Sequence, residues 1–212
     1  MKKIIIGFIF LLVSNASFAK EDALQLQKKW DHIHYEIKDL GDQKKAMQEL
    51  SQLALYEVRQ NPNSAEVKGW AGIILSSEAG YYRINVVKAL GLAKKARTLL
   101  EEAVDMNPKV LNGSVYATLG SLYSEVPPFP IGFGNQDKAQ DYFNKALTIN
   151  QDDIENNFFY AQFLFNKKEY KKALKYFQKA KSAPLRTNRS VADEGRRREV
   201  DIWIGKTQSK IS

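Results

Sequence analysis

A ten-residue pattern occurs twice in this chain at a distance of 34 residues, in KAQDYFNKAL (138–147) and KALKYFQKAK (172–181). A related segment, KARTLLEEAV (95–104), lies upstream. In each segment a small, a large and a small residue are spaced four and three apart, which places all three on one face of an α-helix. The sets are Ala96, Leu100 and Ala103; Ala139, Phe143 and Ala146; and Ala173, Phe177 and Ala180. The pattern predicts helices whose alanines let a neighbouring helix come close.

A second apolar helical pattern precedes each of these segments. Before the middle segment it reads Y-x2-L-G-x2-Y, formed by Tyr116, Leu119, Gly120 and Tyr123. Before the last segment stand Phe159, Tyr160, Ala161 and Leu164, and before the first stand Trp70, Ile73 and Ile74. We therefore expect three helix–turn–helix units that stack on one another.

These motifs resemble the tetratricopeptide repeat family, whose 34-residue unit carries W-x2-L-G-x2-Y followed by A-x3-F-x2-A. The resemblance covers residues 64–187 as three units. It implies an all-α fold, a right-handed superhelical array of antiparallel helix pairs that forms a solenoid. Residues 20–63 fit an N-terminal helical pair, a degenerate repeat or cap, and residues 188–212 fit a C-terminal capping helix and tail.

Two units are longer than the repeat. The middle unit contains an insertion, VPPFPIGFGN at 126–135, and the first unit has a similar excess around residues 78–93. A long apolar loop in a helical array is often functional. Its apolar residues Phe129, Ile131 and Phe133 are expected either to take part in binding or to fold back and plug the groove.

The insertion, the early tryptophans, the ALGLA turn and the closing ADEGRRREV run are together similar to a narrower family. This family comprises bacterial periplasmic repeat proteins grouped with the T component of TRAP transporters. The resemblance spans residues 60–205. It implies a helical protein that can form homo-oligomers and that associates with an extracytoplasmic solute-binding subunit.

The first 19 residues, MKKIIIGFIFLLVSNASFA, have the organisation of a secretory signal peptide. Lys2 and Lys3 precede a ten-residue apolar stretch, and Ser17 and Ala19 supply small residues for cleavage. The stretch is shorter than the ~20 residues that span a bilayer. We expect residues 1–19 to be removed and the protein to be periplasmic; a buried N-terminal helix is the alternative. With no cysteine for lipid attachment, no stable membrane anchor is expected.

Charge is unevenly distributed along the chain. Residues 167–212 hold 14 Lys and Arg against 5 Asp and Glu, whereas residues 20–166 hold 16 against 19. The basic end could attract an acidic partner or an anionic membrane surface, or it could be a solvated helix face. A nucleic-acid partner is not expected for an exported protein.

Composition leaves few residues for catalysis. The absence of cysteine excludes thiolate metal sites and a cysteine nucleophile. The two histidines, His32 and His34, lie two apart on a predicted helix and hence on different faces, so they cannot share a metal ion as an i, i+4 pair could. No nucleophile–base spacing is recognisable. We therefore expect no enzyme activity, no cofactor and no metal.

In such arrays the first helix of each unit lines a concave groove. The expected groove residues are Lys68, Ala71, Leu75 and Glu78 in the first unit, Ser114, Ala117, Ser121, Ser124 and Glu125 in the middle unit, and Glu155, Phe158, Gln162, Phe165 and Asn166 in the last. Small residues at the centre and two phenylalanines favour an apolar occupant. The leading hypothesis is a non-catalytic scaffold that binds a helix or apolar segment of a protein partner. The alternative is a small apolar ligand held between the groove and the 126–135 loop.

Overall fold

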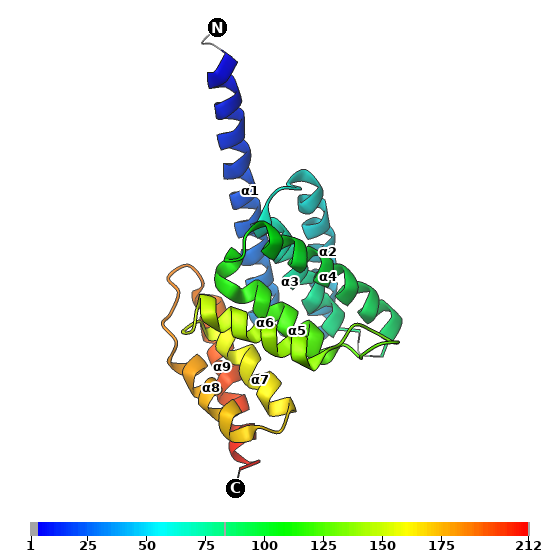
Figure 1. Cartoon of the computed structure of the whole chain (residues 1–212), viewed down its shortest axis with the longest axis vertical. Helices are drawn as coiled ribbons and strands as arrows, with labels where there is room; N and C mark the ends of the chain where they lie inside the picture. Colours follow the sequence, from blue (N-terminus) through cyan, green and yellow to red (C-terminus); the bar gives the residue numbers. More distant parts are fainter. Residues whose placement is uncertain (1–3, 83, 212) are drawn as a thin grey trace.

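The computed structural model describes residues 4–82 and 84–211, with side chains from residue 17 onward. These residues form nine α-helices and one short 3-10 helix, Val110–Gly113, without a β-strand (Figure 1). The helices are α1 (Ile4–Tyr35), α2 (Leu40–Gln60), α3 (Ala65–Gly80), α4 (Val86–Met106), α5 (Ser114–Glu125), α6 (Gln136–Ile149), α7 (Ile154–Asn166), α8 (Tyr170–Ser182) and α9 (Ser190–Gln208).

Successive helices form pairs, and the repeated motif forms the contact within each pair. The pairs α3 with α4, α5 with α6, and α7 with α8 have the most extensive contacts in the described chain. All nine residues of the three small–large–small sets are buried, at 0–1% exposure. A Cβ on Gly120 of α5 would lie 2.9 Å from the ring of Phe143, so the glycine is the surface against which that ring packs. The predicted all-α array of stacked helix pairs is therefore confirmed.

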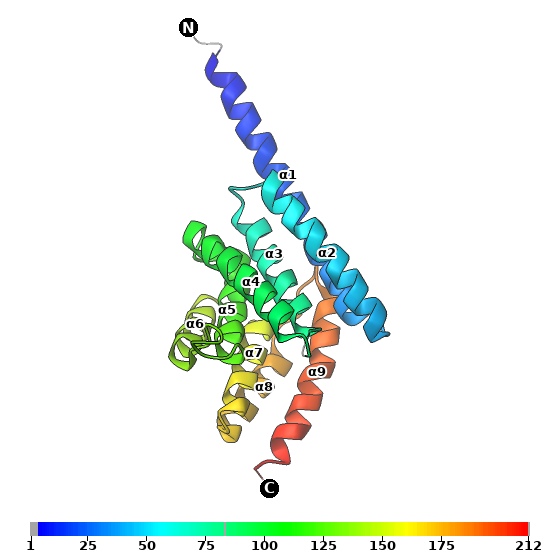
Figure 2. The same cartoon turned by 90° about the vertical axis from the view of Figure 1, so that its right-hand side faces the viewer.

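The first helices of the pairs also contact one another in sequence, α1 with α3, α3 with α5, α5 with α7, and α7 with α9. In addition, α9 contacts α1, so these five helices close into a ring. Figure 2 shows α9 directly below the C-terminal half of α1, on the side of the array opposite α6. The second helices α4, α6 and α8 lie outside this ring.

Several contacts hold α9 and the segment before it against α1, including a close packing contact and an ion pair. The first is Gly195 in the middle of α9, where an added Cβ would overlap the ring of Tyr35 at the end of α1. The second is the ion pair between Arg189 and Asp31, whose side chains are each 9% exposed. The guanidinium also lies over the ring of Trp70 at 5.3 Å. Closure of the ring thus depends on residues 158 positions apart in the sequence.

Replacing Gly195 with alanine should open or strain this closure. The new methyl group overlaps Tyr35, and overpacking of this kind typically costs about 1–3 kcal/mol. Gly205, in the same helix, has nothing within 4 Å of its Cβ position. Gly205→Ala should instead leave the stability unchanged or raise it by up to about 1 kcal/mol, since alanine favours helix over glycine. Urea unfolding of both variants measures the difference; equal stabilities would contradict the packing of α9 on α1.

The segment expected to be a signal peptide lies partly outside the described residues, because residues 1–3 are not described and side chains are described only from residue 17. The expected cleavage point after Ala19 falls within α1. None of the helices in the described part of the chain combines the length and apolar character needed to cross a bilayer.

Candidate functional site

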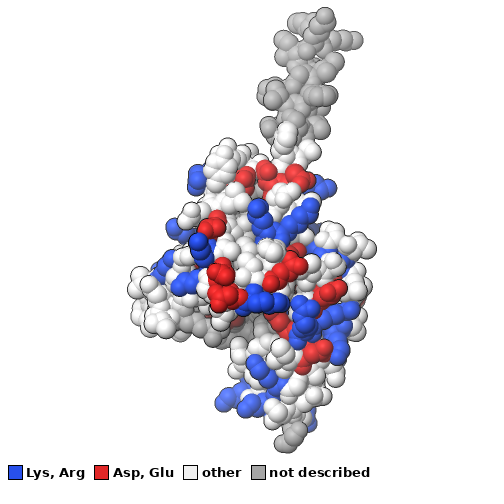
Figure 3. All heavy atoms as spheres, turned by 180° about the vertical axis from the view of Figure 1, so that it is seen from behind, with Lys and Arg blue, Asp and Glu red and all other residues white. Residues whose placement is uncertain are grey.

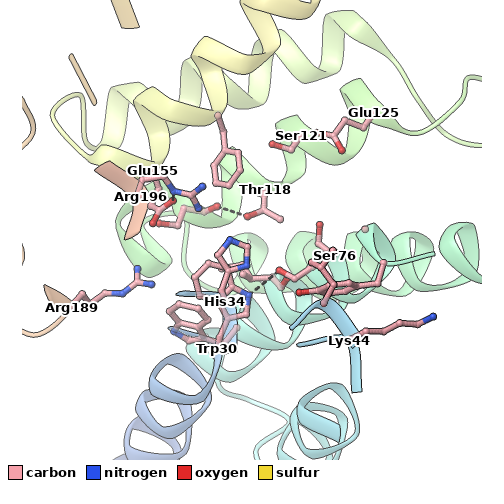
Figure 4. A pocket seen from close by; sticks show the side chains of 18 of the residues that line it. Trp30, His34, Lys44, Ser76, Thr118, Ser121, Glu125, Glu155, Arg189 and Arg196 are labelled. Carbon is pink, nitrogen blue, oxygen red and sulfur yellow. Dashed lines mark hydrogen bonds and ion pairs between the residues drawn. The ribbon is translucent and has the colours of Figure 1, made fainter. Parts of the chain in front are cut away.

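A pocket of about 870 Å³ occupies the centre of the ring of first helices (Figure 4). Its walls come from all five of these helices, with further contributions from the start of α2 and the segment before α9. The lining residues are Trp30, His34, Leu40, Gly41, Lys44, Trp70, Ile73, Ser76, Ser77, Gly80, Tyr81, Ser114, Thr118, Ser121, Glu125, Glu155, Phe159, Arg189 and Arg196. α1, α9 and the segment before α9 thus supply one side of the pocket, with Trp30, His34, Arg189 and Arg196.

Aromatic side chains form one wall of the pocket. Trp30 of α1 stacks on His34 with ring centroids 4.7 Å apart, and the ring centroid of Trp70 of α3 lies 6.1 Å from that of Trp30. The indole Nε1 of Trp30 donates a hydrogen bond of 2.9 Å to Ser77 Oγ. Because this polar atom is satisfied within the protein, the face of the indole is presented as apolar surface. Phe159 of α7 completes the wall.

Small hydroxyl residues of α5 form the opposite wall. Thr118 Oγ1 donates to the backbone oxygen of Ser114 at 2.9 Å, and Ser121 Oγ donates to that of Ala117 at 3.1 Å. Their hydrogens are thus used within α5, while their oxygens can still accept a hydrogen bond. The short side chains leave the space into which Figure 4 shows Thr118 and Ser121 pointing.

The charged residues at the third side of the pocket are paired with one another. Arg196 Nε donates to Glu155 Oε2 at 2.8 Å, and its Nη1 donates to Glu199. Both Arg196 and Glu155 are buried. Glu199 in turn lies 3.6 Å from His34 Nε2, which connects α7, α9 and α1. Arg189 is held in the same way by Asp31.

These pairings set the protonation of the buried groups. Burial alone would raise the pKa of the Glu155 carboxyl, but Arg196, Arg189 and Arg186 outweigh it and hold the pKa below its ordinary value. Burial would lower the pKa of Arg196, yet Glu155 and other neighbours raise it. At Asp31 burial dominates and raises the pKa even though Arg189 opposes it. The guanidinium charges of the pocket are therefore balanced by carboxylates, so the wall favours an apolar or neutral occupant over an anion.

Only part of the expected groove lines this pocket. Ser114, Ser121, Glu125 and Glu155 are lining residues. Ala71, Leu75, Ala117 and Phe158 are instead buried in helix contacts. Glu78 is also buried and lies near Lys88, and Lys68 pairs with Glu102 of α4.

The remaining expected groove residues lie away from the pocket lining. Phe165 packs edge-on against Trp203 of α9, at 5.1 Å between ring centroids. Ser124 Oγ donates to the backbone oxygen of Ser121. Gln162 is half-buried and Asn166 is exposed. For these residues a role in partner binding stays a prediction.

The 126–135 loop does not fill the pocket in this structure. Phe129 and Ile131 are exposed. Phe133 packs edge-on against Tyr123 at 5.3 Å, with the guanidinium of Arg97 over its other side at 4.5 Å. None of the three is among the pocket-lining residues.

Comparison with known proteins supports the repeat. The family described as Tetratricopeptide repeat matches residues 131–153 and 154–184, which contain α6, α7 and α8. This is the part of the chain in which the 34-residue spacing is strict. No curated protein matches the chain.

Proposed function

We propose that this chain is a non-catalytic periplasmic scaffold that receives an apolar segment of a protein partner in its central pocket. The observation that carries the proposal is the pocket itself: tetratricopeptide repeats commonly mediate protein–protein interactions, and α7, within the matched repeat region, lines an aromatic-walled pocket together with α1, α3, α5 and α9. Periplasmic location rests on the signal-peptide pattern of residues 1–19. The similarity to the T component of TRAP transporters suggests a solute-transport or envelope system as the setting.

The size of the pocket limits what enters it. The volume of about 870 Å³ lies within the range of roughly 300–1,000 Å³ typical of small-molecule sites. A whole α-helix, which is about 10–12 Å across with its side chains, is too large to enter such a pocket along its length. The occupant is therefore a few side chains or a chain end, with the rest of the partner on the rim. Apolar anchors in a desolvated pocket of this kind carry most of the binding energy of an interface.

Thr118→Trp should abolish partner binding by filling the pocket from α5. The variant is compared with Thr98→Trp, which makes the same change at an exposed site on α4. After crosslinking in cells and affinity capture, the wild type and Thr98→Trp should enrich the same envelope protein and Thr118→Trp should not. Thermal unfolding shows whether each variant is folded. Equal capture by a folded Thr118→Trp protein, or no capture by the wild type, would contradict the proposal.

A small apolar ligand is the second candidate, favoured by the pocket volume of about 870 Å³ and by the wall formed by Trp30, Trp70 and Phe159. Native mass spectrometry of freshly purified protein should then show an added mass that is lost in Thr118→Trp and kept in Thr98→Trp. If the purified protein has only its own mass and specifically captures a protein partner, the ligand-binding hypothesis is excluded and the scaffold function is retained.

A further inference from the structure

The two segments that make their units longer than the 34-residue repeat, around residues 78–93 and at residues 126–135, lie together at one end of the molecule. The 126–135 loop lies against the first turns of α4: a Cβ on Gly132 would be 3.4 Å from Leu90 Cδ2, and Arg97 covers Phe133. The segment before α4 and the α5–α6 loop are both at the right-hand end of the molecule in Figure 1. The structure thus brings together two insertions that are separated by α4 and α5 in the sequence.

Apolar side chains at this end project into solvent. The exposed fractions are 99% for Ile84, 89% for Phe129, 84% for Val87, 63% for Ile131 and 50% for Val86. We call these five residues the loop patch. Side chains this exposed have little contact with the protein, so burying them elsewhere would be favourable.

Basic residues outnumber acidic residues beside the loop patch, and two of the cations are paired: Lys88 lies 3.9 Å from Glu78, and Arg97 lies 3.7 Å from Glu101. Residues 79–100 contain five basic residues (Arg83, Lys88, Lys94, Lys95 and Arg97) and no acidic residue, and residues 126–135 contain no charge. Lys94 and Lys95 are exposed on α4. In Figure 3, which views the molecule from behind, the corresponding left-hand end is mainly white, with blue and some red beside it.

We propose that the loop patch inserts reversibly into the surface of an anionic lipid bilayer. Apolar tips bordered by lysines suit the boundary between headgroups and acyl chains, where the tips are buried and the cations meet anionic lipid. The attachment is peripheral and uses no spanning segment. Gly80, Tyr81 and Glu125, where α3 and α5 lead into the two loops, line the central pocket, so the bilayer would lie beside the pocket.

The cysteine-free chain allows a direct test. The full chain is made as single-cysteine variants Ile84→Cys, Phe129→Cys and Ile202→Cys, each labelled with the environment-sensitive fluorophore NBD. Ile202 is an exposed isoleucine of α9 and serves as the matched control. With vesicles of phosphatidylglycerol and phosphatidylcholine, labels at 84 and 129 should become brighter, shift to the blue and be quenched by doxyl-labelled lipid. The label at 202 should not change, even if the N-terminal segment itself binds the vesicles.

A charge variant tests the role of the lysines. Lys94→Glu combined with Lys95→Glu should weaken the response of the 129 label about tenfold or more, since each basic residue near an anionic surface contributes to binding. The matched pair Lys171→Glu and Lys172→Glu, exposed on α8, should leave it unchanged.

Three results would overturn the proposal. The first is the absence of any response at 84 and 129, or an equal response at 202. The second is a response that depends on protein concentration without vesicles, which would show that the loop patch joins two copies of the chain. The third is loss of binding in the α8 variant alone, which would assign the lipid contact to the basic C-terminal region.

Discussion

Phe143→Ala should lower the free energy of unfolding by about 3–5 kcal/mol, as expected for removal of a fully buried aromatic side chain. The ring is 1% exposed and lies between Gly120 of α5 and the rings of Tyr160 and Phe163 of α7. It therefore connects one repeat to the next, and alanine leaves a cavity that α5 and α7 cannot easily close. Urea unfolding followed by circular dichroism measures the loss.

Two further phenylalanines provide the comparison. Phe177 occupies the equivalent place 34 residues later and is 0% exposed. Phe177→Ala should therefore lower the free energy of unfolding by a similar amount. Phe129 is 89% exposed, and Phe129→Ala should change stability by no more than about 0.5 kcal/mol. If Phe143→Ala were as stable as Phe129→Ala, the repeat would not be the packing unit described here.

Arg196→Met should cost about 3–5 kcal/mol, the usual effect of removing one partner of a buried ion pair. Methionine keeps much of the volume of the arginine stem but leaves Glu155 without its 2.8 Å donor and Glu199 without its neighbour on α9. The guanidinium also lies 4.3 Å from the ring centroid of Phe158, and this contact is lost as well. Urea unfolding at neutral pH measures the loss.

Arg198 of the same helix is the matched control, because it is exposed. Arg198→Met should stay within about 0.5 kcal/mol of the wild type. Similar stabilities of the two variants would show that Arg196 is not buried against Glu155. The pocket would then present a free cation and would favour an anionic occupant.

The repeat could be predicted from sequence because its contacts are local. Alanine, phenylalanine and glycine at fixed helical spacing encode the packing of adjacent helices, and residues such as Ala139 and Ala173 report that packing directly. The sequence therefore predicted the helical pairs, and it led us to expect a concave groove lined by the first helices. On α5, the residues expected in the groove included Ser114, Ser121 and Glu125, all of which line the pocket.

On α3, the residues expected in the groove are not the residues that line the pocket. The expected face carried Lys68, Ala71, Leu75 and Glu78, whereas the pocket is lined by Trp70, Ile73, Ser77 and Gly80. A displacement of two residues turns the face by roughly 200°. The stripe from Trp70 to Gly80 also recurs at helical spacing, but α3 is buried on all sides between Gly69 and Leu75, so periodicity alone does not show which side meets the cavity.

Closure of the array by α1 and α9 was not predicted either. A solenoid is usually governed by contacts between neighbouring repeats, and the contacts that close this one join residues far apart in the sequence, such as Asp31 and Arg189. Trp30, His34 and Arg196 therefore did not appear among the expected pocket residues. Gly195 packs against the ring of Tyr35 where α9 meets α1. Neither residue indicates this contact in the sequence, because nothing near them shows that these two helices meet.

A double-mutant cycle on Asp31 and Arg189 tests the closed ring most directly. Asp31→Asn, Arg189→Gln and the double variant are unfolded in urea at neutral pH, and the coupling energy is calculated from the four stabilities. Because the two side chains are in contact across the closure, the ring predicts a coupling of about 0.5–3 kcal/mol. A coupling of zero within error would show that α1 and the segment before α9 do not meet, and the central pocket would lack the side that they supply.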